Sequence, residues 1–294
     1  ALVGSQQAAS QLLDGLGQLE YRGYDSAGIA TVDAPGLLSC LIAKGKLGNL
    51  KARVDAEGAP GRCGIGHTRW APHGKPEERN AHPHRSQDGS VAVVQNGIIE
   101  NHRNLRDALE SRGVVFQSET DTEVIPHLVA EELQRCLSAG EPATAALLLQ
   151  AVRAVLNLLE GAYALAVIWD QLPGALVVAR KAAPLLIGLG EGEFLCASDT
   201  PALAGFTRTI LPMEDGEVAL LSPLGVELYD ASGERQHRLP TQLSATEQVA
   251  DKRHFRHFML KEIHEQPETA ALWVARHLPA GLPAERPVAL PFDD

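Results

Sequence analysis

Five stretches of the chain carry apolar residues at the three- and four-residue spacing of an amphipathic helix. In the first, alanine and leucine line one face until Gly23 interrupts the pattern. In the last, Gln266-Pro267 interrupts the pattern near its start. The spacing predicts helices over residues 6–20, 103–110, 122–137, 144–159 and 261–278.

Shorter apolar or β-branched runs have the length of strands. They cover residues 27–32, 37–43, 63–68, 91–94, 163–169, 175–179, 185–189, 194–197 and 218–221. The helical patterns between 103 and 159 are grouped between two blocks of these runs, instead of alternating with them one by one. This order predicts an α+β domain built from layered antiparallel sheets.

The 294 residues leave room for one large core or two domains. From about residue 230 the chain becomes polar and loses any apolar period, which is the composition of a linker. We therefore predict a domain over residues 1–229, a linker over 230–251 and a further segment over 252–294.

The charge and cysteine content narrow the classes of partner. The net charge is -11 and the lysines and arginines are scattered, so we expect no nucleic-acid partner. No apolar stretch reaches the roughly 18 to 20 residues that span a bilayer, so we expect no membrane association. The four cysteines lie far apart without a C-x-x-C pair, which fits a reducing cytoplasm better than a disulfide scaffold.

Three polar segments together supply the groups needed to hold a free amino acid and attack its side-chain amide. Residues 64–70 read Gly-Ile-Gly-His-Thr-Arg-Trp and supply a cation, and residues 96–101 read Asn-Gly-Ile-Ile-Glu-Asn and supply two oxyanion donors. Residues 119–123 read Glu-Thr-Asp-Thr-Glu and supply an anion. The combination predicts L-glutamine as the ligand.

Two further features accompany these segments: Tyr-Arg-Gly-Tyr-Asp-Ser-Ala-Gly at 21–28, and a Ser at 118, just before the acidic motif. Together the motifs occur in the same order as in a known family. Over about residues 1–229 the chain resembles the glutaminase domain of the glutamine–fructose-6-phosphate aminotransferase (isomerizing) family, also called glucosamine-6-phosphate synthases. This is a class II (type 2) glutamine amidotransferase domain. The resemblance implies the N-terminal nucleophile (Ntn) hydrolase fold, an αββα sandwich of two antiparallel sheets between helical layers.

The same resemblance extends to the C-terminal segment. Lys-Glu-Ile-His-Glu-Gln-Pro at 261–267 resembles the stretch by which this family enters its sugar-isomerase (SIS) half. It implies that residues 252–294 lead into a SIS domain that the chain does not contain. It also implies a homodimer formed through that missing domain.

The resemblance assigns roles to residues that also have simpler interpretations. Arg69 is expected to clamp the substrate α-carboxylate, although an isolated arginine is more often an exposed ion-pair residue. Asp121 is expected to bind the α-ammonium, and it could also cap the helix that begins at Thr122. Asn96 and Gly97 are expected to form the oxyanion hole, although Asn-Gly after a strand is also a common hairpin signal.

The remaining expected contacts come from two other motifs. Arg22 is carried over as a residue near the nucleophile, and Trp70 and His73 as substrate-binding residues of a loop that closes over glutamine. Pro72 stands where the family usually has Thr, which removes a hydroxyl and a backbone donor. Gln95 stands where the family often has His.

The family's nucleophile is an N-terminal cysteine in a Cys-Gly-Ile-Val opening, whose own α-amine acts as the base. Aligning the first predicted helix places Ala1 directly after such an opening, so the nucleophilic cysteine is absent from the chain. We therefore expect the chain as given to be inactive. Cys63 is the nearest internal thiol in sequence, but it falls in an apolar strand and is interpreted as a buried structural residue.

The resulting hypothesis is an enzyme. The intact protein would hydrolyse glutamine through a γ-glutamyl thioester and transfer the ammonia to fructose 6-phosphate in hexosamine (UDP-N-acetylglucosamine) synthesis. No metal or other cofactor is implied, because amide hydrolysis needs only a nucleophile, a base and an oxyanion hole.

Two alternatives remain open. One is a non-catalytic glutamine-binding module, which fits a chain without the nucleophile. The other is a metal-dependent hydrolase, because His67, His73, His82 and His84 are crowded in sequence. These histidines lack the i, i+4 helical spacing with a nearby Glu that zinc hydrolases show.

Overall fold

A computed structural model describes residues 1–22, 25–69, 77–243, 255 and 258–277, with two compact units, Ala1–Val249 and Ala250–Asp294. The second unit contains the helix α7 (Phe258–His277), which passes through Pro267. The predicted interruption at Gln266-Pro267 is therefore wrong. A helical proline removes one backbone hydrogen bond, and the turns on either side keep theirs. None of the helices in the described ranges is both long and apolar enough to cross a membrane.

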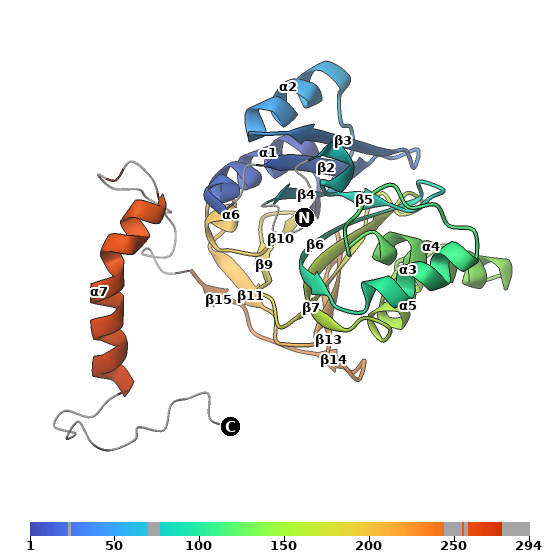
Figure 1. Ribbon diagram of the computed structural model, residues 1–294. Coiled ribbons are helices and arrows are strands. Elements are labelled where there is room, and N and C mark those ends of the chain that lie inside the picture. The colour runs from blue at the N-terminus through green and yellow to red at the C-terminus, as the bar shows by residue number, and fades with distance from the viewer. Residues whose placement is uncertain (23–24, 70–76, 244–254, 256–257, 278–294) are drawn as a thin grey trace. The chain divides into compact units, whose positions relative to one another are not determined.

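The first unit is built on two antiparallel sheets (Figure 1). Sheet A has the strand order β15-β11-β9-β10-β1-β4-β2-β3. Its strands are β1 (Leu2–Gly4), β2 (Ser26–Val32), β3 (Leu38–Lys44), β4 (Cys63–Arg69), β9 (Leu186–Leu189), β10 (Glu193–Ala197), β11 (Thr209–Pro212) and β15 (Thr241–Gln242). Sheet B has the order β14-β13-β12-β8-β7-β6-β5. Its strands are β5 (His84–Arg85), β6 (Val91–Ile99), β7 (Gly161–Trp169), β8 (Leu176–Lys181), β12 (Val218–Ser222), β13 (Gly225–Tyr229) and β14 (Arg235–Gln236).

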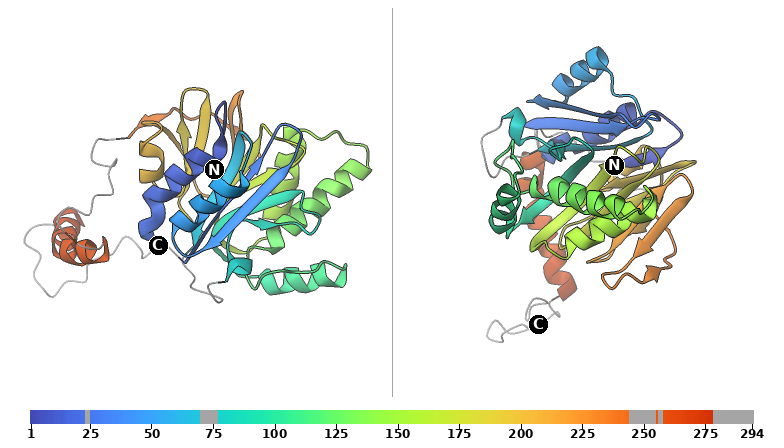
Figure 2. Two further views of the ribbon diagram at one scale, coloured as in Figure 1. Left: turned by 90° about the horizontal axis from the view of Figure 1, so that it is seen from above. Right: turned by 90° about the vertical axis from the view of Figure 1, so that its right-hand side faces the viewer.

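Helices cover the outer face of each sheet (Figures 1 and 2). Those on sheet A are α1 (Ala8–Leu19), α2 (Leu47–Glu57) and α6 (Pro201–Ala204), and those on sheet B are α3 (His102–Ser111), α4 (Val124–Ser138) and α5 (Ala145–Leu156). Two short 3-10 helices, η1 (Glu20–Arg22) and η2 (Glu78–Asn80), complete the unit. The layers are therefore helix, sheet, sheet and helix, the order that the family resemblance implied.

The alternation of side chains along the central strands explains why the sheets stack. On β7, Leu165 and Val167 pack into the core beneath α4 and α5, while Ala166 and Ile168 pack into the core between the two sheets. A strand with both faces buried in this way reads as a continuous apolar run.

The predicted elements agree with these positions to within a few residues, except that β6 runs on to Ile99, and the structure also contains elements that were not predicted. Helix α2 was not predicted, since it buries only Leu50 fully and so lacks a long apolar stripe. Strands β1, β5, β11 and β13 and helix α6 were also missed, because elements of two to five residues are too short to show a clear period. Finally, β14 and β15 lie inside the predicted linker 230–251 and pair with β13 and β11, so the folded unit extends beyond residue 229.

Candidate functional site

A cavity of about 820 Å³ opens where the two sheets meet the start of the chain. Sheet A contributes Ala1, Arg69 and Cys196 to its lining, and sheet B contributes Asn96 and Gly97. Ala1 exchanges two backbone hydrogen bonds of 2.8 Å with Cys196, which continues the pairing of β1 with β10. The direction of β1 is therefore fixed, and tracing it back from Gly4 leads into the cavity.

Arg69 is the last residue of β4 and is only 6% exposed. Burial lowers the pKa of its guanidinium, while the charges of Asp25 and Asp121 act in the opposite direction. An arginine remains protonated under such conditions, so a cation stands at the cavity wall. Arg69 is therefore not the exposed residue that the simpler interpretation expected.

Asp121 lies in the segment between α3 and α4 and also lines the cavity. Its Oδ2 accepts a hydrogen bond of 2.7 Å from the backbone N–H of Ile99, at the end of β6. Helix α4 begins at Val124, with Glu123 in the N-cap position, so Asp121 does not cap it. The contact instead joins the Asp121 carboxylate to the strand that carries Asn96 and Gly97.

Asn96 and Gly97 lie within β6, paired with Ala164 and Tyr163 of β7. The hairpin interpretation is therefore wrong, because the strand continues through them to Ile99. Gly97 has a φ of 113°, and a Cβ added to it would lie 2.1 Å from the carbonyl oxygen of Ala162. Only glycine fits this conformation and this spacing. Gly97 is also one of the residues that line the cavity.

The Asn96 side chain contacts a histidine from the opposite sheet. Its Oδ1 lies 2.8 Å from Nε2 of His67 on β4. The His67 ring stacks on His82 with centroids 4.4 Å apart and planes 19° apart, and His82 meets the edge of His84 at 4.7 Å. Burial lowers the pKa of His67 and of His84 to about 4, and that of His82 well below its usual value. These buried rings are therefore neutral at physiological pH.

The arrangement of these histidine rings is relevant to the alternative hypothesis of a metal-dependent hydrolase. Within the described ranges, no group of three or more His, Cys, Asp or Glu side chains is placed to hold a metal ion. His67, His82 and His84 pack ring against ring instead of turning their nitrogens toward one point. His73, the fourth histidine of that hypothesis, lies outside the described residues.

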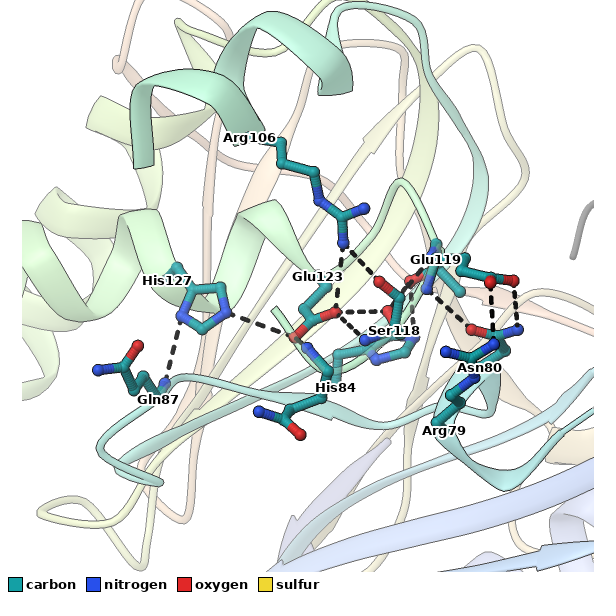
Figure 3. Close-up of polar contacts among 11 residues, drawn as sticks. Arg79, Asn80, His84, Gln87, Arg106, Ser118, Glu119, Glu123 and His127 are labelled. Carbon is teal, nitrogen blue, oxygen red and sulfur yellow. Dashed lines mark hydrogen bonds and ion pairs between the residues drawn. The ribbon is translucent and has the colours of Figure 1, made fainter. Parts of the chain in front are cut away.

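A buried carboxylate organises the segment that carries Asp121 (Figure 3). Glu123 is 2% exposed and accepts hydrogen bonds from the backbone N–H groups of Gln117, at 2.7 Å, and Ser118, at 2.6 Å. Arg106 and His127 approach the same carboxylate at 3.7 and 3.6 Å. Burial acts to raise the pKa of Glu123, but the interaction with His127 and the hydrogen bonds from Gln117 and Ser118 outweigh it and lower that pKa to about 2.

The same segment is tied to η2 on its other side (Figure 3). The backbone N–H of Glu119 donates to Oδ1 of Asn80 at 2.9 Å, and the Glu119 carboxylate accepts from Arg79 at 2.8 Å. Thr120 Oγ1 lies 3.0 Å from Nε2 of His84. These contacts hold the segment around Asp121 in place on both sides without regular secondary structure.

Three of the four internal cysteines, Cys63, Cys136 and Cys196, are buried, and Cys40 is half-buried. Cys63 lies at 3.4 Å from the carbonyl oxygen of Ala175, and burial raises its pKa to about 12. Burial also raises the pKa of Cys196 to about 12 and that of Cys40 to about 11. A thiol with such a pKa is almost entirely protonated at neutral pH and is a poor nucleophile. The interpretation of Cys63 as a structural residue agrees with this environment.

Several predicted residues cannot be placed in the cavity. Trp70, Pro72 and His73 lie outside the described residues. Arg22 belongs to η1, but its side chain is likewise outside the description. Gln95 is buried, and its Oε1 accepts a hydrogen bond of 2.7 Å from Thr122 Oγ1.

Sequence reasoning missed the apolar wall of the cavity and the groups that orient its polar residues. The apolar wall includes Leu16, Leu19, Pro184, Leu203 and Phe206. In the sequence, a leucine that lines a cavity has the same helical spacing as one that packs in a core, so no pattern could separate them. The contact between His67 and Asn96 joins two sheets, and no local pattern signals it.

Comparison with known proteins gives a consistent picture. Residues 67–205 match a family described as "Glutamine amidotransferase domain". A glutamine–fructose-6-phosphate aminotransferase (isomerizing) of Thermosynechococcus vestitus is 54% identical over 290 residues, which are 99% of this chain and 45% of that protein. A protein of the same name from Nostoc sp. is 54% identical over 265 residues, covering 90% of this chain and 42% of its own length. The chain thus spans about half the length of these curated relatives.

Solved structures share the fold. The glutamine phosphoribosylpyrophosphate amidotransferase of B. subtilis is similar with a TM-score of 0.64 and 27% identity, over 81% of this chain and 49% of that one. The two-sheet architecture predicted from the sequence is therefore confirmed.

Proposed function

We propose that this chain, which carries a glutamine amidotransferase domain like that of the glutamine–fructose-6-phosphate aminotransferases, binds L-glutamine in the cavity between its sheets and hydrolyses the side-chain amide once an N-terminal cysteine is present. One observation carries the proposal. A buried cation, Arg69, an anion, Asp121, and an amide donor, Asn96, line the same cavity although they are far apart in sequence.

The two charged residues suit the two charges of a free amino acid. The guanidinium of Arg69 can hold both oxygens of an α-carboxylate, and the Asp121 carboxylate can accept from the α-ammonium. Asp121 uses Oδ2 for the backbone of Ile99, which orients the carboxylate before the ligand arrives. Trp70 and His73 are proposed as further substrate contacts, from the family resemblance.

The oxyanion donors follow from the contacts of β6. Because Oδ1 of Asn96 is bonded to His67, the amide nitrogen of Asn96 is the group left to donate to the substrate oxygen. We place the backbone N–H of Gly97 beside it as the second donor. Donors fixed in a strand before the reaction stabilise the charge that develops on the amide oxygen.

The proposed nucleophile is a cysteine four residues ahead of Ala1, with its own amine as the base. Strand β1 pairs with β4 at Leu2 and Gly64, and β4 continues to Arg69. In this antiparallel register four residues ahead of Ala1 would lie beside residues 66–69, within the cavity. Arg22 is proposed to lie near this cysteine, because η1 directly follows α1, which lines the cavity through Leu16 and Leu19.

The decisive experiment compares three chains. One begins at Ala1, one is extended by Cys-Gly-Ile-Val with a free cysteine amine, and one carries Ser in place of that Cys. We expect all three to bind glutamine in calorimetry and only the cysteine chain to release glutamate and ammonia. Turnover by the chain that begins at Ala1 would refute the proposed nucleophile. Binding without turnover in all three would favour a glutamine-binding module, the candidate that the buried internal thiols support.

We further propose that the whole protein passes the ammonia to fructose 6-phosphate, acting as a homodimer through a SIS domain in the cytoplasm. The names of the relatives support the acceptor. The four free cysteines, all without a disulfide partner, fit a reducing compartment. Fructose-6-phosphate-dependent formation of glucosamine 6-phosphate by the full-length protein tests this wider role.

A further inference from the structure

We propose that His67 is a positioning residue for the oxyanion hole. By donating from Nε2 to Oδ1 of Asn96, it keeps the amide nitrogen of Asn96 turned toward the reacting oxygen of glutamine. The inference rests on the proposed function.

The orientation of the Asn96 amide decides whether it helps or hinders the reaction. An asparagine amide presents a donor on one side and an acceptor on the other, and the two ends are nearly the same size. If Oδ1 pointed at the developing oxyanion, two negative oxygens would meet and the barrier would rise. An oxyanion hole built from an asparagine side chain therefore needs a group that fixes which end faces the substrate.

His67 supplies such a group. Nε2 of His67 lies 2.8 Å from Oδ1 of Asn96, a normal distance for a hydrogen bond. Because Oδ1 can only accept, the proton of the neutral ring must be on Nε2. With the ring proton on Nε2, turning the Asn96 amide over would break this bond and place the amide NH₂ group against the imidazole N–H.

His67 is held through its backbone and through the face of its ring. Its backbone is part of β4 and pairs with Gly28 of β2. Its face stacks on His82 at 4.4 Å, and His82 in turn accepts a hydrogen bond of 3.3 Å from the backbone N–H of Gln95, the neighbour of Asn96. Because His67 is held by its own strand and by the stacked His82, its Nε2–H group has little freedom to move with a rotating Asn96 amide. The position of this donor therefore fixes the orientation of the amide.

A neutral histidine suits this position better than a charged side chain. Burial and the nearby cation Arg69 both lower the pKa of His67, to about 4. The ring therefore orients Asn96 without adding a second positive charge to the wall where Arg69 is expected to bind the α-carboxylate. Lysine or arginine would donate a hydrogen bond but would also compete for the ligand's anionic end.

Two substitutions separate the hydrogen bond from the packing of the ring. His67→Phe keeps an aromatic ring against His82 and removes the donor. His67→Gln removes the ring and keeps an amide donor the same number of bonds from the backbone. In the cysteine-extended chain we expect His67→Phe to lower kcat by about 10-fold or more with KM within about 2-fold, and His67→Gln to recover most of the loss.

A double-mutant cycle with Asn96→Ala completes the test. If His67 acts through Asn96, then His67→Phe lowers kcat by no more than about 2-fold once Asn96 is alanine. His84→Leu is the matched control, since His84 belongs to the same buried stack but bonds to Thr120. Its effect is expected to multiply with that of Asn96→Ala, with rates expressed per active site.

The outcomes are distinct. The proposal is supported if His67→Gln is active, His67→Phe is impaired, and the effects of His67→Phe and Asn96→Ala on kcat are not additive. Full activity of His67→Phe with loss in His67→Gln would show that only the packing of the ring matters and would overturn it. Independent effects of His67 and Asn96 would overturn it as well. If the unsubstituted cysteine-extended chain has no glutaminase activity, the proposed function fails first and is recognised separately.

Discussion

The two sides of the cavity are fixed by opposite means. Asn96 sits in a central strand and is oriented by a stack of uncharged histidines. Asp121 sits in an irregular segment and is held by a charged network around Glu123 (Figure 3). A strand already has a partner for each backbone group, so only the side chain needs orientation. In an irregular segment the backbone N–H groups have no partner on a neighbouring strand, and one buried carboxylate can accept hydrogen bonds from several of them.

The difference also matches the chemistry expected on each side. Charge that appears during the reaction is best met by neutral, fixed dipoles, which change little between ground state and transition state. Charge already present on the ligand, such as an α-ammonium, is best met by a full opposite charge. We therefore expect substitutions on the histidine side to alter kcat and substitutions on the Glu123 side to alter stability and glutamine affinity.

The largest effect is expected at Glu123. Glu123→Ala leaves the buried N–H groups of Gln117 and Ser118 without an acceptor and removes the anion beside Arg106 and His127. We expect the free energy of unfolding to fall by about 3 kcal/mol or more in urea titrations. Glu131→Ala is the control, because its pair with Arg112 is exposed and should be worth less than about 1 kcal/mol. Equal losses in both variants would remove the contrast between the two sides.

Asn96→Ala tests the other side. In the cysteine-extended chain we expect kcat to fall by about 10² to 10³ while KM changes little, because the donor acts mainly when the amide oxygen gains charge. Thermal stability should barely change, since Asn96 is half-buried and its backbone remains in the β6–β7 ladder. A destabilised variant with normal kcat would show that Asn96 is structural.

Arg69→Ala and Asp121→Ala probe the charges that face the ligand. Each is expected to weaken glutamine binding by about 2 kcal/mol, roughly 30-fold, if the charged pairs are desolvated. Calorimetry on the chain that begins at Ala1 measures this without turnover. Arg53→Ala serves as control, because Arg53 pairs with Glu57 on the surface of α2. Unchanged affinity in both cavity variants would contradict the assignment of the clamp.

The two sides of the cavity are expected to lose their contributions to stability in different ranges of pH. The pKa of His67 is lowered from 6.5 to about 4, so the unfolded state binds more protons in that range and stability falls as pH drops from about 6.5 toward 4. The pKa of Glu123 is lowered from 4.5 to about 2, so its contribution is lost only as pH drops from about 4.5 toward 2.

Urea unfolding at a series of pH values measures both windows. His67→Phe should flatten the pH dependence between about 6.5 and 4, by up to about 1.4 kcal/mol per pH unit for one proton. Glu123→Gln should flatten it only below about 4.5. The same change of slope in both variants would mean that the two sides do not titrate independently.

The sequence predicted the parts of the site that depend on residue type and not the contacts that depend on the fold. Arg69, Asp121 and Asn96 were indicated by the kind of group that each motif supplies, and the cavity brings these groups together. The Asn-Gly pair also carried a turn signal, and only the pairing with β7 decides against it. Local patterns cannot report such pairing, because the partner residues are more than sixty positions away.

The same limit applies to the buried network. Nothing in the local sequence distinguishes Glu123 from the exposed Glu119, since both occur in one acidic motif. Glu123 and Glu119 differ only in the folded structure, where Glu123 is buried at the start of α4 beside Arg106 and His127. By contrast, the long amphipathic periods predicted α1, α4 and α5 well, because a helix of three or more turns repeats its own signal.

The direction of β1 has a practical consequence for the handling of this protein. Because Ala1 is hydrogen-bonded to Cys196 of β10 and lines the cavity, anything fused ahead of it runs into the cavity and not into bulk water. An affinity tag at this end would compete with the ligand for space, and an uncleaved initiator methionine would block the amine of an added cysteine. Purification handles therefore belong at the other terminus, and amino-terminal processing should be verified by mass spectrometry before any activity is judged absent.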